Sequence, residues 1–364
     1  MSQSNSDNVS RRSFVKSAAA AAVAVSAAPA ILRGADMPKT LGKDRYTYEV
    51  VPNWGALPEG KKYGNTHGVC ETADGRIFIH NASPTGDCTC IFDPDGKFMK
   101  SWGQSFGDCL KNGAHGMQLR KDGNDEVLYL ATTNCHKVFK TTLDGEVLMT
   151  LEYPKDAKNA KGEPCYAGPD KYAPTNIAFG PNGDFYVADG YGSNYVHQYD
   201  IKGDYIRTFG GTGTDDGQLK CPHGIWCDTR DSANPMILVA DRSNVRLQWF
   251  TLDGKHIKTI SQAQAGKEGK DILRHPCHFD QRGGDLLIPD LHGRLTIFDK
   301  ENNLITHLGD PADPKKRGNH GVPPDQLVPG EFITPHQAIW DRAGNIYCAE
   351  WLPYGRVTKL KLVS

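Results

Sequence analysis

Six short segments of the 364-residue chain place a polar residue, most often histidine, at the start of an apolar strand. Histidine occupies this key position in five of the six segments, and asparagine occupies it in the other. The six residues are His67, His115, Asn176, His223, His278 and His336. Neutral imidazole is a good ligand for zinc, copper, iron and nickel. If the fold brings these positions together, the chain has the side chains for a transition-metal site.

Three of the six residues would suffice, because a catalytic zinc ion takes three protein ligands and keeps a position for water or substrate. Alternate segments give two sets, and only one is all histidine: His115, His223 and His336. We predict these three as ligands, with zinc favoured over other transition metals, and His67, His278 and Asn176 as further residues of the channel. The alternative is that the histidines fill the channel by bonding to one another and to water, although burying unpaired imidazoles is costly.

The strands that must position these residues repeat every 47 to 61 residues. After each key position come apolar runs separated by turns such as Asp74-Gly75 and Asn182-Gly183. Short β-branched and aromatic runs with such turns indicate hairpins, and four strands per repeat at this period are typical of a propeller blade. The sequence therefore predicts an all-β fold, a six-bladed β-propeller, in which the first strand of each blade lines the central channel.

The two ends of the repeat region complement each other. The last repeat stops after its third strand, Gly355 to Leu362, and an unpaired strand, Tyr46 to Val51, precedes the first repeat. Because an open sheet edge exposes unpaired backbone groups, we predict that Tyr46 to Val51 supplies the fourth strand of the last blade. A ring closed in this way makes residues 36–364 one domain, although length alone would suggest two.

Residues 1–35 carry the pattern of an export signal. Arg11-Arg12 is followed by a weakly hydrophobic run, Ser17 to Leu32, with small residues at Ala28-Pro29-Ala30. This pattern is typical of the twin-arginine route, and a run of about 16 residues is short for a membrane span. We expect a periplasmic or extracellular protein without stable membrane insertion after cleavage. An ordinary secretory signal and an uncleaved anchor are the alternatives.

The charge balance argues against nucleic acid and acidic membranes as binding partners. With 42 Lys and Arg against 43 Asp and Glu, the net charge is -1, and no basic cluster indicates nucleic acid or an acidic membrane. A small-molecule or peptide substrate fits better.

Of the ten cysteines, some should pair in an oxidising compartment. The loop residues Cys109, Cys165 and Cys221 are the better candidates.

Further motifs follow one another from Ala114 to the C-terminus. They are His115-Gly116-Met117, Pro174-Thr175-Asn176-Ile177-Ala178, Val187 to Asn194, Gly217-Gln218-Leu219 with Pro222-His223, Val239 to Arg246, and Pro335-His336. In order and interval they resemble the peptidyl-α-hydroxyglycine α-amidating lyases, a family of six-bladed propellers with NHL-type repeats and a zinc ion held by three histidines. The resemblance implies His115, His223 and His336 as the zinc ligands, the set that blade alternation also selects.

The resemblance also implies roles for two other residues. Tyr191, in the Asp-Gly-Tyr segment, corresponds to the candidate base, and a phenol with a reference pKa of about 10 ionises more readily beside a cation. Arg242 corresponds to an arginine that faces the site and could bind a substrate carboxylate. Without the resemblance, Tyr191 would be interpreted as an aromatic rim residue, and Arg242 as a partner of Asp241 or Asp189.

Two features depart from the family pattern. The family has an arginine in the first blade that assists binding, and the stretch from His80 to Cys90 contains none. The family also has a calcium ion in the channel, bound by two backbone carbonyls, at the positions of Val69 and Met117, and by an aspartate, which is Gln337 here. Because losing a carboxylate weakens a calcium site, we expect at most weak calcium binding.

Three functions are compatible with these residues. The leading hypothesis is an exported metal-dependent lyase similar to the amidating lyases. The second is a non-catalytic NHL-type propeller that serves as a binding scaffold with a structural metal. The third is a metal-dependent hydrolase of an unknown small substrate, which would use zinc-bound hydroxide as the nucleophile.

Overall fold

The structure, a computed structural model, describes residues 40–261 and 272–363. All described residues belong to one compact unit, Pro38–Ser364. The expected export signal in residues 1–35 lies outside the described residues. Within the described ranges, no helix is long and apolar enough to cross a membrane.

Five antiparallel sheets of four strands follow one another along the chain as blades 1 to 5. Blade 1 consists of β3 (Asn65–Glu71), β4 (Ile77–Ala82), β5 (Thr89–Phe92) and β6 (Phe98–Trp102). Blade 2 consists of β7 (Ala114–Asp122), β8 (Asp125–Thr132), β9 (Lys137–Thr142) and β10 (Val147–Leu151). Blade 3 consists of β11 (Asn176–Phe179), β12 (Phe185–Ala188), β13 (Tyr195–Tyr199) and β14 (Tyr205–Gly210). Blade 4 consists of β15 (Pro222–Asp228), β16 (Met236–Asp241), β17 (Arg246–Phe250) and β18 (His256–Ser261). Blade 5 consists of β19 (Asp280–Arg282), β20 (Asp285–Asp290), β21 (Arg294–Phe298) and β22 (Leu304–Leu308).

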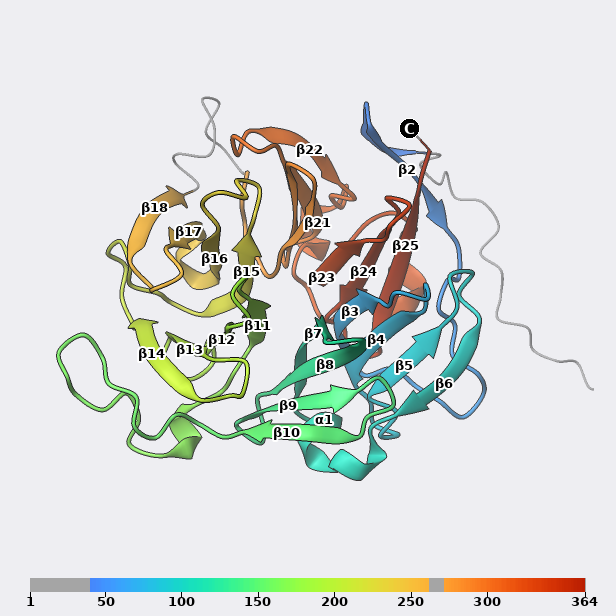
Figure 1. The fold of residues 1–364 in the computed structure, drawn as a ribbon. Coiled ribbons are helices and arrows are strands. Elements are labelled where there is room, and N and C mark those ends of the chain that lie inside the picture. The colour runs from blue at the N-terminus through green and yellow to red at the C-terminus, as the bar shows by residue number, and fades with distance from the viewer. Residues whose placement is uncertain (1–39, 262–271, 364) are drawn as a thin grey trace, which may run out of the picture. The chain divides into compact units, whose positions relative to one another are not determined.

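Blade 6 joins the two ends of this compact unit. Its sheet has the order β1-β2-β25-β24-β23, from Leu41–Lys43 and Tyr46–Val51 through Arg356–Leu362 and Ile346–Glu350 to Pro335–Trp340. β2 runs antiparallel to β25, with Tyr48 opposite Leu362, and Figure 1 shows the blue strand beside the red one. The predicted six-bladed propeller and its closure by Tyr46–Val51 are therefore confirmed. The short fifth strand β1 was not predicted.

Apolar side chains of neighbouring blades pack against each other. Tyr129 of blade 2 clusters with Ile177, Phe185 and Tyr199 of blade 3, and all four are fully or almost fully buried. Burial of one such side chain contributes roughly 1.5–3 kcal/mol. This packing, repeated between successive blades, fixes the first strands around a common axis, as Figure 1 shows for β3, β7, β11, β15 and β23.

Helical structure in the described residues is confined to short segments. They are α1 (Asp108–Lys111), η1 (Gln104–Phe106), η2 (Pro169–Lys171), η3 (Arg242–Asn244), η4 (Pro314–Lys316) and η5 (Pro324–Gln326). Cys109 of α1 forms a disulfide with Cys135, which ties the segment before β7 to the β8–β9 connection. The prediction of pairing is thus confirmed for Cys109. It is wrong for Cys165 and Cys221, which are free thiols buried by their surroundings.

Candidate metal centre

A β-bulge at the start of each first strand determines which residues are equivalent. In blade 1 the register shifts between Thr66 and Gly68, and in blade 6 between Pro335 and Gln337, so His67 and His336 are the bulged residues. In blades 2 and 4 the register shifts between Ala114 and Met117 and between Pro222 and Ile225, so His115 and His223 lie in the corresponding bulges. We call the bulged residue of each blade its ring position.

In blades 3 and 5 the ring position is not the residue that the sequence pattern suggested. Asn176 pairs with Ala188 as Gln337 pairs with Ala349, one residue beyond the bulge. In blade 5, Pro276 pairs with Asp290 as Pro222 pairs with Asp241 in blade 4. The ring positions of these blades are therefore Thr175 and Cys277, and the predicted equivalence of Asn176 and His278 with the other histidines is wrong. A bulge adds one residue to one strand, and the proline directly before the ring position in blades 3 to 6 was the signal in the sequence: Pro174, Pro222, Pro276 and Pro335.

The four ring-position histidines contact one another. The ring centroids of His115, His223 and His336 form a nearly equilateral triangle with sides of 4.7–4.8 Å. The ring centroid of His67 lies 4.8 Å from that of His115 and 4.7 Å from that of His336. Two overlapping groups of three histidines thus share His115 and His336.

Three of these histidines are oriented by backbone carbonyls of the next blade. The Nδ1 atoms of His115, His223 and His336 lie 2.7, 2.8 and 2.9 Å from the carbonyl oxygens of Thr175, Cys277 and His67. A carbonyl only accepts, so each Nδ1 carries the hydrogen and each Nε2 keeps its lone pair. Outer hydrogen bonds of this kind fix the tautomer and orientation of metal-ligating histidines. The predicted ligand set therefore shares one threefold arrangement.

Glycines after His115 and His223 permit these close approaches. A Cβ atom on Gly116 would lie 2.3 Å from the Thr175 carbonyl oxygen, and one on Gly224 would lie 2.5 Å from that of Cys277. Any larger residue would push the neighbouring strand away and break the bond to Nδ1. The His-Gly pairs are thus required by the packing of adjacent blades.

Buried carboxylates at the ends of second strands hold the loops that lead into the ring positions. Asp189 accepts a hydrogen bond from the backbone N–H of Ala173 at 2.7 Å, and also one from that of Ser193. In later blades the equivalent carboxylates also accept hydrogen bonds from backbone N–H groups: Asp241 from Lys220, Asp290 from Arg274, and Glu350 from Ile333. Acidic residues that end apolar strands were a signal of this arrangement in the sequence. The Asp241 carboxylate also forms an ion pair with Arg246, whose Nε lies 2.6 Å from Asp241 Oδ2. The alternative interpretation of Arg242, as a partner of Asp241, is therefore wrong.

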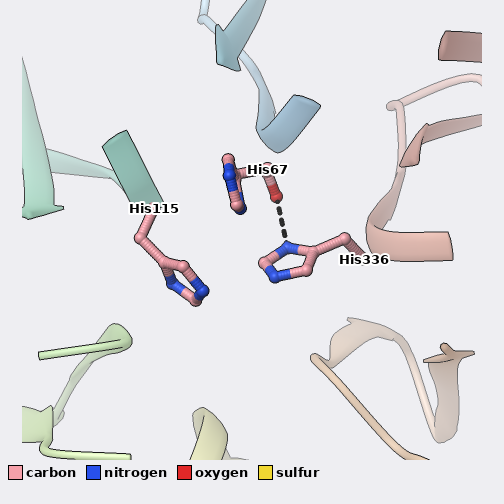
Figure 2. Close-up of side chains that lie close together, drawn as sticks. All are labelled: His67, His115 and His336. Atoms are coloured by element: carbon pink, nitrogen blue, oxygen red, sulfur yellow. Dashed lines mark hydrogen bonds between the residues drawn. The ribbon is translucent and has the colours of Figure 1, made fainter. Parts of the chain in front are cut away.

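In the group that contains His67, the ring nitrogens are close enough together to hold one metal ion. Ring nitrogens of His67, His115 and His336 lie within 4.8 Å of one another, and all three residues are buried. Figure 2 shows these side chains turned toward a common centre, with the bond from His336 to the carbonyl of His67. Burial lowers the pKa of His115 to about 4 and those of His67 and His336 well below the usual value. These imidazoles are therefore neutral near pH 7, the form that binds metal.

Tyr191 and Arg242 lie beside these histidines. The Tyr191 hydroxyl is 3.2 Å from Nε2 of His223 and 3.4 Å from Nε2 of His115. The residue as a whole is 47% exposed, although its hydroxyl points toward the two histidines. Burial of the hydroxyl end raises the pKa of Tyr191 to about 12, and the positive charge of Arg242 opposes this shift.

A cavity of about 400 Å³ opens onto the site. Its lining includes His67, His115, His336, Tyr191, Arg242 and Trp351. His223 does not contribute to this lining, and its Nε2 faces the Tyr191 hydroxyl instead. Arg242 brings a positive charge to the wall, which suits a substrate with a carboxylate.

The residues expected near a second ion are joined by hydrogen bonds. Nε2 of Gln337 lies 3.0 Å from the carbonyl oxygen of Val69 and 3.3 Å from that of Met117. Two carbonyls and a neutral amide, without a carboxylate, do not fit a calcium ion, which prefers several oxygen ligands including carboxylates. Asn176 and His278 belong to a neighbouring group, in which Nε2 of Gln118 lies 3.3 Å from Asn176 Oδ1 and 2.6 Å from His278 Nε2.

Curated proteins similar to this chain include amidating enzymes. The chain is 31% identical over 189 residues to peptidyl-glycine alpha-amidating monooxygenase B of Xenopus laevis, which covers 49% of this chain and 19% of the relative. It is 29% identical over 288 residues to peptidyl-alpha-hydroxyglycine alpha-amidating lyase 1 of Drosophila melanogaster, which covers 71% of this chain and 46% of the relative. The chain thus spans less than half the length of these relatives. No protein-family model matches it. The predicted resemblance to the amidating lyases is confirmed.

Solved structures support the fold alone. Virginiamycin B lyase from Staphylococcus aureus aligns with 82% of this chain and 96% of its own, with a TM-score of 0.51 and 13% identity. A protein of unknown function from Bacteroides thetaiotaomicron aligns with 82% of this chain and 70% of its own, with a TM-score of 0.57 and 13% identity.

Proposed function

We propose that this chain is an exported, zinc-dependent lyase of the amidating type, with His115, His223 and His336 as metal ligands. The observation that carries the proposal is the set of three Nδ1–carbonyl bonds, which leave three neighbouring Nε2 lone pairs without a hydrogen. Similarity to amidating enzymes supports the reaction class. The twin-arginine pattern supports export to the periplasm or cell exterior.

The residues of the cavity suit an α-hydroxyglycine substrate. Arg242 would bind the substrate carboxylate, and Tyr191 would accept the proton of the substrate hydroxyl. The C–N bond would then break, releasing glyoxylate, and the nitrogen would recover the proton from Tyr191 to complete an amide. A zinc ion bound by the histidines would supply Lewis acidity toward a substrate oxygen. Because burial raises the pKa of Tyr191 to about 12, its role as a base depends on nearby positive charge.

Elemental analysis of the purified protein and of single variants tests this ligand set. We expect about one equivalent of zinc in the wild type and its loss in His115→Ala, His223→Ala and His336→Ala. His67→Ala and His256→Ala, a partly buried histidine of β18, should keep the metal. Turnover of α-hydroxyhippurate by the zinc-loaded wild type then tests the reaction. Zinc that survives His223→Ala but not His67→Ala would replace the proposed ligands with His67, His115 and His336.

A binding scaffold with a structural metal is the second candidate, and His67 favours it. The His67 ring contacts those of His115 and His336. If His67 joined the three proposed ligands, four imidazoles would complete a tetrahedral set and leave no position for substrate. A zinc-loaded wild type without turnover of α-hydroxyhippurate, whose zinc is lost on His67→Ala as well, would support the scaffold and contradict the lyase.

A further inference from the structure

Gln337 connects three strands that carry histidines of the site. Its side chain is 2% exposed, and its Nε2 lies 3.0 and 3.3 Å from the carbonyl oxygens of Val69 and Met117. Only the nitrogen end of the amide can donate to carbonyls, which fixes the orientation of the group. One amide thus joins β23 to both β3 and β7.

The bonded atoms are close in sequence to the histidines. Val69 lies two residues after His67, Met117 lies two residues after His115, and Gln337 directly follows His336. These are the three histidines whose ring nitrogens lie within 4.8 Å of one another. A shift of any of the three strands along or away from the axis would therefore move a histidine and stretch a bond to Gln337.

The residues equivalent to Gln337 in the other blades do not make this connection. Three are glycines: Gly68, Gly116 and Gly224. A Cβ atom on Gly68 would lie 2.8 Å from that of Met117, so β3 and β7 are already in close contact where Gln337 reaches them. The other two are Asn176, whose Oδ1 accepts from the next backbone N–H, and His278, which meets the Gln118 amide.

We propose that Gln337 is a positioning residue that sets the spacing of His67, His115 and His336 through an uncharged bridge between their strands. The inference rests on the proposed metal site for its function but not for its geometry. Without the amide, two buried carbonyls lose a donor, which is costly in a closed interior. The strands would then move apart until other donors reach these carbonyls, and the histidines would move with them.

Gln337→Leu tests the bridge because leucine fills similar space and donates no hydrogen bond. Gln198→Leu is the matched control, since Gln198 is a buried glutamine of β13 whose amide donates to Asp184 at 2.6 Å, away from the site. In metal-free protein labelled with ¹⁵N-histidine, we expect Gln337→Leu to shift the imidazole resonances of His67, His115 and His336 and to spare His256. Its Co²⁺ affinity should fall about 10- to 100-fold, and that of Gln198→Leu should stay unchanged.

Gln337→Glu distinguishes loss of the bridge between strands from a general loss of stability. A carboxylate would repel the two carbonyl oxygens, but together these oxygens would form a calcium site. We expect Ca²⁺ to restore Co²⁺ affinity in Gln337→Glu and to have no such effect in the wild type or in Gln337→Leu. If Gln337→Leu does not fold, Gln337→Glu with and without Ca²⁺ decides the question.

Unchanged imidazole resonances in Gln337→Leu would overturn the proposal. An equal loss of Co²⁺ affinity in Gln198→Leu would also overturn it, as would a Co²⁺ affinity of Gln337→Glu that does not respond to Ca²⁺. A wild type that binds no Co²⁺ would contradict the proposed metal site instead. The imidazole resonances of the metal-free variants would still decide the role of Gln337.

Discussion

Arg242 donates a hydrogen bond to the hydroxyl of Tyr191 at 3.2 Å, and its guanidinium carbon lies 5.3 Å from the centre of the same ring. The thiols of Cys221 and Cys277 flank the guanidinium at 3.2 and 3.9 Å. Arg242 is therefore held from several sides, and its charge acts on the hydroxyl that faces His115 and His223. This relationship would couple the proposed carboxylate binding by Arg242 to the proposed proton transfer at Tyr191.

Tyr191→Phe should separate proton transfer from metal binding. The substitution removes only the hydroxyl, so zinc content should stay at the wild-type value. Turnover of α-hydroxyhippurate should fall about 10²- to 10⁴-fold, as expected for loss of a general base. Tyr205→Phe is the control, because Tyr205 is an exposed tyrosine of β14. Full turnover by Tyr191→Phe would exclude the proposed role of its hydroxyl.

The Cys109–Cys135 disulfide should stabilise the fold in proportion to the loop it closes. The two cysteines are 26 residues apart, and a loop of this length corresponds to about 3.5 kcal/mol of unfolding free energy. Replacing both with serine should lower the free energy of unfolding in urea by about that amount. A reductant should lower the stability of the wild type similarly and leave the variant unaffected. Equal stability of the two proteins without reductant would contradict this prediction.

Tyr48 should be a major contributor to ring closure. It lies in β2, is fully buried, and accepts a hydrogen bond from Trp340 Nε1 at 2.9 Å. Tyr48→Ala should reduce the free energy of unfolding by about 3–5 kcal/mol, as for other large aromatic deletions. Glu49→Ala, at the exposed neighbouring position, should change it by less than about 0.5 kcal/mol. Similar losses of unfolding free energy in both variants would show that burial of the Tyr48 side chain is not what stabilises the closed ring.

His197 should make the protein sensitive to acid. Burial lowers the pKa of His197 to about 3 in the folded protein, whereas an unfolded histidine has a pKa of about 6.5. Between these values the unfolded chain binds more protons, so the free energy of unfolding falls as the pH falls. His197→Gln cannot gain this charge and should lose less stability between about pH 6.5 and pH 3.

The buried carboxylate of Asp189 changes the free energy of unfolding with pH in the opposite direction. Comparing the wild type with His197→Gln removes this contribution. Burial raises the pKa of Asp189 to about 6, so its protonation favours the folded state as the pH falls. Both proteins retain Asp189, and the difference between their unfolding curves therefore reports His197. Parallel curves across this pH range would rule out the assigned role of His197.

Much of the architecture was predictable because it follows from repeated local patterns. Asp-Gly and Asn-Gly turns mark the hairpins, and the unpaired run Tyr46–Val51 found its partner in β25 because a missing strand leaves two complementary edges. β1 is only three residues long and carries no alternating pattern that would identify it.

The site was less predictable because it depends on register. His223 occupies a ring position and His278 lies one residue beyond one. Counting from the preceding proline, Pro222 or Pro276, separates the two histidines, whereas the prediction matched them by residue type alone. Ring contacts also place His67 as close to His115 as His223 is, which no spacing rule indicates. Cys135, which pairs with Cys109, lies in a turn whose position is set only by the packed blades.

The pairing of β2 with β25 also determines when the protein can be completed during synthesis. The ribosome releases Tyr46–Val51 long before their partner in the sheet, Arg356–Leu362, has been synthesised. Blade 6 supplies His336 and borders blade 1, which supplies His67. A nascent chain that lacks β23 therefore cannot assemble the histidine cluster, and any metal bound there would be captured only after that strand has been synthesised.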